Sequence, residues 1–93
     1  MFDVKKFVAY LAFHDPIREL FFDMAEARGI NSRWDMYHVL ANEERVPPAE
    51  VEIMSEIYES RIKGNLAEEE LYNKAIEDFQ MNLRKKITDR LKG

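Results

Sequence analysis

The sequence contains no cysteine, and it has only three glycines and three prolines in 93 residues. Without cysteine there is no disulfide framework, no thiol nucleophile and no thiolate ligand for zinc. So little glycine and proline excludes a linker or a fibrous repeat. No stretch approaches the roughly 18 uncharged apolar residues that a membrane span needs. We therefore expect a soluble, cytoplasmic protein.

The residues that are present indicate one folded domain over residues 1–93. Hydrophobic residues make up 46% of the chain, which is too many for a disordered tail, and the length leaves no room for a second domain. The apolar stretch at the start is interrupted by Lys5 and Lys6 and has no small-residue cleavage site after it, so it does not predict a targeting signal.

Charge is unevenly distributed along the chain. Residues 1–42 carry five basic and six acidic side chains, residues 43–80 carry four and eleven, and residues 81–93 carry five and one. The chain therefore lacks the uniformly basic character of many nucleic-acid-binding domains. The basic end has two interpretations. Its cations complement the dipole at the end of a helix, or they form a patch for an acidic partner or a phosphate backbone.

Apolar residues recur at spacings of three and four, which predicts helices, and no sustained alternation predicts a strand. We expect an all-α fold: a compact bundle of four to five helices with a long C-terminal helix. Asp3 is the expected N-cap of a first helix that ends at His14. A second helix starts at Asp15 and ends near residue 28, where Gly29 closes it in a Schellman motif.

Three further helices are expected in the rest of the chain. A short one begins at Asn31 or Ser32 and continues to residue 41. Its candidates for burial are Trp34, Tyr37, Leu40 and Ala41. The next begins at Pro48, because a proline pair forbids helix before it and permits helix after it, and it stops at Gly64. The last begins near Ala67 and contains no glycine or proline before residue 93.

The last predicted helix is too long for the domain that carries it. About 25 residues would extend about 37 Å, whereas a compact chain of this size measures roughly 32 Å across. Its apolar positions have the spacing of a short coiled-coil seam: Tyr72, Ile76, Phe79 and Leu83, followed by Ile87 and Leu91. Either a second copy of the chain covers the outer half of this helix, as in a homodimer, or the first helix packs there within the monomer.

Residues 24–30 resemble the first helix and turn of a helix-turn-helix, with an alanine, Gly29 and an aliphatic residue in the required order. The apolar positions that should follow are displaced by one, because Asp35 and His38 stand where Met36 and Val39 are needed. The resemblance implies a DNA-binding transcriptional regulator. The residues that would contact nucleic acid in this alternative are Asn31, Ser32, Arg33, Lys85 and Lys86.

Other chemistry finds little support in the sequence. Asp35 and His38 lie three residues apart and could reach one ion, but a helical metal site needs further ligands, so we expect a surface pair. No serine lies beside a histidine, no glycine-rich loop could hold phosphate, and no carboxylate is marked as buried. We expect no enzymatic activity, no metal and no cofactor.

The aromatic residues favour a binding surface. The first helix carries aromatic and aliphatic residues over more than one stripe, and Phe22 points away from the buried face of the second helix. Small domains rarely leave so much apolar surface in water. We predict a protein interface formed by Phe2, Phe7, Tyr10, Phe13 and Phe22. The expected function is that of an adaptor, inhibitor or regulatory subunit that acts by protein–protein association and self-associates.

Overall fold

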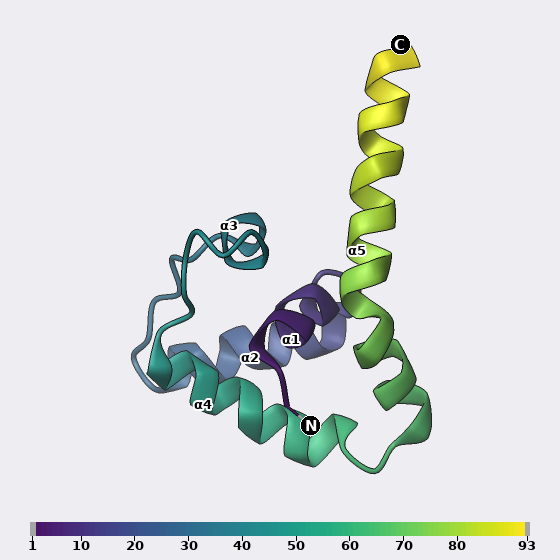
Figure 1. Ribbon diagram of the computed structural model, residues 1–93. Coiled ribbons are helices and arrows are strands. Elements are labelled where there is room, and N and C mark those ends of the chain that lie inside the picture. Colours follow the sequence, from purple (N-terminus) through teal and green to yellow (C-terminus); the bar gives the residue numbers. More distant parts are fainter. Residues whose placement is uncertain (1, 93) are drawn as a thin grey trace.

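The computed structural model describes the backbone of residues 2–92 and the side chains of residues 2–85. This part of the chain contains five α-helices and no strand, which confirms the all-α fold with a long C-terminal helix (Figure 1). The helices are α1 (Val4–Leu11), α2 (Asp15–Ala27), α3 (Met36–Leu40), α4 (Pro48–Ile57) and α5 (Leu66–Lys92), with a π-helical turn η1 (Tyr58–Ile62) after α4. Among the described residues, no helix is both long enough and apolar enough to cross a membrane.

The Schellman motif expected after α2 is present. Gly29 has a φ of 73°, in the left-handed region that favours glycine. The N–H of Ile30 donates to the carbonyl of Ala25 at 2.9 Å, and the N–H of Gly29 donates to the carbonyl of Glu26 at 3.0 Å. These two bonds satisfy carbonyl groups that the end of a helix would leave without partners.

The third helix is shorter than predicted and begins at Met36 rather than at residue 31 or 32. The physical reason is the capping group. The carboxylate of Asp35 accepts hydrogen bonds from the N–H of Tyr37 at 2.8 Å and of His38 at 3.3 Å. The helix therefore starts after Asp35, and residues 30–34 form a connection without regular secondary structure.

The burial predicted for this third helix is also corrected. Val39 is its one fully buried residue among those described, whereas Tyr37 is 51% exposed. Leu40 and Trp34 pack against the core and are partly buried, whereas Ala41 is exposed. Tyr37 lies on the open side of α3 and remains accessible.

Helix α1 is the centre of the core. Five consecutive residues of α1 are buried, namely Phe7, Val8, Ala9, Tyr10 and Leu11. The helix contacts α2, α3, α4 and α5, which enclose it from several directions. A helix that is apolar around most of its circumference is typical of a central position. Its excess of apolar residues, which the sequence analysis assigned to an external interface, is explained by burial within the chain.

Helix α5 extends past the rest of the molecule. Its 27 residues correspond to a length of about 40 Å. The longest dimension of the chain is 44 Å and its radius of gyration is 14.0 Å, compared with about 12 Å for a compact domain of this size. In Figure 1 the C-terminal half of α5 rises beyond the other helices.

The first half of α5 packs on α1 through Tyr72 and Ala75, which are both buried. The two ways to cover the outer half of this helix, by a second copy or by the first helix, stay predictions. Leu83, in that half, is 38% exposed, so none of the described residues covers it fully. The continuation of the seam at Ile87 and Leu91 lies outside the residues whose side chains are described.

Candidate protein interface

The most apolar hollow next to the projecting helix lies between α3 and α5. It encloses about 420 Å³, and we refer to it as the α3–α5 groove. Its apolar lining consists of Tyr37, Leu40, Ala41, Ile76, Phe79 and Leu83. Lys5 and Gln80 complete the lining. The groove is thus an apolar surface with one cation and no carboxylate among the described residues that line it.

Two of the residues that line the α3–α5 groove, Tyr37 and Phe79, are aromatic. The ring of Phe79 lies 5.3 Å from that of Tyr37 and 6.5 Å from that of Phe13, measured between centroids. Both distances lie in the range in which tilted or edge-to-face rings attract each other. Rings from three segments that are distant in sequence therefore meet at Phe79, while α3 itself packs on α1.

Two local features of the sequence keep the groove open. The Asp35 cap delays the start of α3 by several residues, so that α3 is one short turn with the ring of Tyr37 on its open side. Helix α5 contains no glycine or proline between Leu66 and Lys92, so it continues straight past the end of α3. Because α3 is short and α5 is long, Leu83 on α5 is only partly covered.

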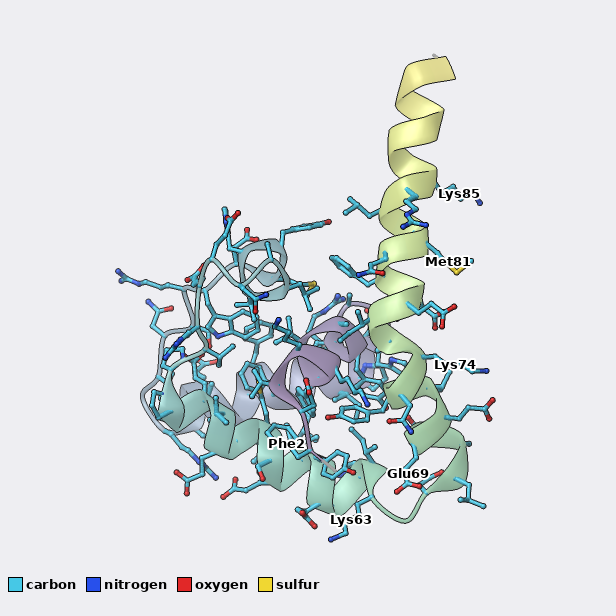
Figure 2. The ribbon with its side chains drawn as sticks, viewed as in Figure 1. Phe2, Lys63, Glu69, Lys74, Met81 and Lys85 are labelled. Atoms are coloured by element: carbon cyan, nitrogen blue, oxygen red, sulfur yellow. The ribbon has the colours of Figure 1, made fainter. Side chains whose placement is uncertain are left out.

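The opposite side of α5 has a different character. Figure 2 shows Lys74, Met81 and Lys85 on the side of the helix that points away from the rest of the molecule. Met81 is more exposed than Leu83, but it has charged neighbours and does not line the groove. The two residues lie about 200° apart around the helix, so each marks one face of α5.

The structure corrects the placement of Phe7 and Tyr10. Both side chains are completely buried within the single chain and are not accessible to a partner. Phe2 is half-buried, because its ring packs against Phe7 at 6.1 Å and Tyr58 at 5.6 Å. The physical reason is the central position of α1, which directs its aromatic rings into intrachain contacts.

Phe13 and Phe22 remain exposed, as the prediction required. Phe13 follows the end of α1 and lies at the edge of the ring cluster around Phe79. Phe22 lies on α2 and is 45% exposed, with its ring 5.3 Å from the buried ring of Phe21. The predicted interface residues therefore divide into a buried pair, the half-buried Phe2 and two exposed rings on different faces.

The residues of the nucleic-acid alternative do not form one surface. Asn31 and Arg33 are exposed in the connection before α3, outside any helix. The hydroxyl of Ser32 donates to the carboxylate of Glu50, so it is directed inward. Lys85 lies on the outer side of α5, and the side chain of Lys86 is outside the described residues. A helix-turn-helix needs a helix directly after its short turn, and here six residues separate Gly29 from Met36.

A buried carboxylate is present that the sequence did not reveal. Glu50, in the first turn of α4, is only 2% exposed. One of its oxygens accepts hydrogen bonds from the hydroxyl of Ser32 and from the indole N–H of Trp34, the latter at 2.9 Å. These bonds compensate for the loss of hydration and attach the connection before α3 to α4. Because Glu50 holds Ser32 and Trp34 in this way, its role is structural.

Two tyrosines anchor α5 to the N-terminal segment. The hydroxyl of Tyr10 donates a hydrogen bond to the carboxylate of Glu68. The hydroxyl of Tyr72 donates to the backbone carbonyl of Asp3 at 2.9 Å and accepts from the backbone N–H of Asp3 at 2.6 Å. Burial, supported by the neighbouring carboxylate of Glu68, raises the pKa of Tyr10. Burial likewise raises the pKa of Tyr72 to about 12. The base of the projecting helix is therefore held firmly.

The pair considered for metal binding has other partners. Asp35 caps α3, and Nδ1 of His38 lies 2.7 Å from the carboxylate of Glu43. This hydrogen bond raises the pKa of His38 above its ordinary value, and the carboxylates of Asp35, Glu43 and Glu44 add to the effect. In the part of the chain that the structure describes, no three acidic or histidine side chains converge as ligands for a metal ion.

The α3–α5 groove is not marked as a site in the sequence. Periodicity predicts that Tyr37 is buried, and it predicts a coiled-coil seam that includes Phe79 and Leu83. The signal that pointed to this region was the mismatch between the length of the last helix and the diameter of the domain. The position of α3 beside that helix could come only from the tertiary structure.

The chain matches no protein-family model, no curated protein and no solved structure.

Proposed function

We propose that this protein acts by protein–protein association, as a small adaptor, inhibitor or regulatory subunit, and that the α3–α5 groove is the surface through which it binds. The observation that carries this proposal is an apolar groove beside a helix that extends past its own domain. The groove exposes Tyr37, a residue type enriched at interfaces, with the aliphatic Leu83 also exposed in its lining.

The geometry supports docking of a helix. The groove lies between two helices and is lined in part by aromatic rings, and amphipathic helices bind in grooves of this kind through side chains spaced one turn apart. Tyr37 and Phe79 contact each other within the chain, and the base of α5 is held by Tyr10 and Tyr72. A preformed surface reduces the entropic cost of association.

The proposal is tested by affinity capture of the tagged chain from its native lysate, with the wild type and two variants compared. Leu83→Asp places a charge in the groove, and Met81→Asp places the same charge on the other face of α5. We expect a partner that is recovered with the wild type and with Met81→Asp and is lost with Leu83→Asp. Both positions are exposed, so both variants should keep the helical circular dichroism spectrum.

The capture is repeated after nuclease treatment to test the transcriptional-regulator alternative. A protein that is retained after nuclease treatment and depends on Leu83 supports association through the groove. Loss of every partner on nuclease treatment, or equal recovery with both variants, would overturn the proposal. Loss of every partner on nuclease treatment would favour nucleic-acid binding through Arg33 and the basic end of the chain.

A further inference from the structure

We infer that the α3–α5 groove is occupied by helix α2 of a second copy of this chain, with Phe22 inserted between Tyr37 and Leu83. This inference rests on the proposed function and adds to it the identity of one partner. It unites two exposed features that lie on different elements and share no residue: the groove itself, and the aromatic ring on the outer face of α2.

The outer face of α2 combines an aromatic ring with negative charge. Phe22 is three residues after Glu19 and four before Glu26, so the three side chains lie on one side of the helix. Asp23 follows directly, and all four residues are exposed. We call this set the acidic face of α2. The ring of Phe22 packs on Phe21 and is 45% exposed, so its open edge can serve as an anchor for a pocket on another molecule. Arg18, which lines the same hollow as this ring, forms an ion pair with Asp15.

The α3–α5 groove has the complementary character. It is lined by aromatic and aliphatic side chains, with Lys5 as its charged member. Among the described residues, no carboxylate lines the groove. The acidic face of α2 would therefore meet a cation and no like charge there, which favours this encounter over others.

The charges at the end of the chain disfavour pairing of the projecting ends of two α5 helices, because residues 81–93 carry five basic side chains and one acidic side chain. Each end carries a net charge of about +4 in sequence, so two of them placed side by side would repel each other. Within one copy, Phe22 cannot reach the groove, because its helix packs on α1 and α4 and contributes no residue to the groove lining. The acidic face is thus available to another copy.

A contact between two different faces has a consequence for assembly. Each copy offers an acidic face and a groove, so association is head-to-tail, and it continues to longer chains unless the rotation closes a ring. If one copy keeps only its groove and another keeps only its acidic face, the two can form a single contact and no more. This property allows the two faces to be tested separately.

The experiment measures mass by sedimentation or light scattering over a range of concentration. The wild type should exceed the 11.1 kDa of the monomer as its concentration rises. Phe22→Asp and Leu83→Asp should each remain monomeric. An equimolar mixture of the two variants should reach twice the monomer mass and stop there, because each variant supplies the face that the other lacks.

Matched controls separate this contact from general effects of charge. Met81→Asp alters the other side of α5 and should self-associate as the wild type does. Asp23→Lys should weaken self-association by about tenfold or more, which corresponds to about 1.4 kcal/mol, whereas Glu52→Lys on the exposed side of α4 should leave it unchanged. Circular dichroism checks that every variant keeps its helical content.

Several outcomes would overturn the inference. A wild type that is monomeric at every concentration would exclude it, and so would a mixture of the two monomeric variants that fails to pair. Self-association that persists in Phe22→Asp would show that another surface is used. If the chain is monomeric but still captures a partner through Leu83, this inference fails and the proposed function stands.

Discussion

Removing the carboxylate of Glu50 is expected to destabilise the fold far more than removing any exposed carboxylate. The side chain is 2% exposed and accepts hydrogen bonds from Ser32 and Trp34. In Glu50→Ala both donors remain in place without an acceptor. A hydrogen bond to a charged group contributes about 1.5–3 kcal/mol. Ser32 and Trp34 are only half-buried, so water can partly replace the lost acceptor and the lower value applies to each bond. Two bonds at about 1.5 kcal/mol each give a loss of about 3 kcal/mol, which is a large fraction of the roughly 5–15 kcal/mol that stabilises a small domain.

The assay is thermal unfolding followed by circular dichroism, together with the fluorescence of Trp34, which is the only tryptophan in the chain. For a domain of this size, about 3 kcal/mol lowers Tm by roughly 12–24 °C. Glu50→Gln keeps an oxygen that can accept both hydrogen bonds but removes its charge. It should cost about half as much, because charge-assisted hydrogen bonds are roughly twice as strong as neutral ones.

Glu52→Ala is the matched control, since it removes the same side chain from the exposed side of the same helix. We expect it to change stability by less than about 0.5 kcal/mol. A double-mutant cycle with Trp34→Phe should show a coupling energy between positions 34 and 50. If Glu50→Ala and Glu52→Ala unfold at the same temperature, or if the coupling is zero, the assignment of Glu50 as the anchor of the connection before α3 is refuted.

Two further predictions concern the ends of helices and the titration of tyrosine. Gly29→Ala should lower the free energy of unfolding, measured with urea, by about 1 kcal/mol. The cause would be backbone strain alone, because φ is 73° and an added Cβ meets no atom within 4 Å. Gly29→Asn should lower it by less, and equal stability of Gly29→Ala and the wild type would contradict the strain argument. The pKa values of Tyr10 and Tyr72 are raised in the folded state, so the folded protein holds these two protons more tightly than the unfolded chain does. The free energy of unfolding should therefore keep its full value below about pH 10 and decrease above it, by up to about 1.4 kcal/mol per pH unit for each tyrosine. Urea midpoints across this pH range should fall less steeply in Tyr10→Phe, and an unchanged slope would mean that the hydroxyl of Tyr10 is not held in its protonated form.

The sequence by itself determined the helices and most of their ends. Gly29, Pro48 and Asp3 act through local geometry, since each adopts a backbone conformation or offers a capping atom within a few residues of its own position. The periodic apolar residues then fix the fold class, because a helix with one apolar stripe must bury it against another helix. The excess length of the last helix could also be read from the sequence.

The tertiary structure alone decided which apolar residues are buried within the chain and which remain accessible to a partner. The aromatic residues of α1 look like those of a surface helix with an extra binding face, yet neighbouring helices enclose Phe7 and Tyr10 completely. Tyr37, by contrast, looks like a core residue and is exposed, because the cap at Asp35 shortens its helix. The burial of Glu50 beneath Trp34 likewise depends on a connection without regular secondary structure, which periodicity does not describe. Whether a residue is buried depends on the elements that pack around it. The local sequence pattern therefore predicts a helix and its apolar face, but it does not distinguish a face buried within the chain from a face that binds a partner.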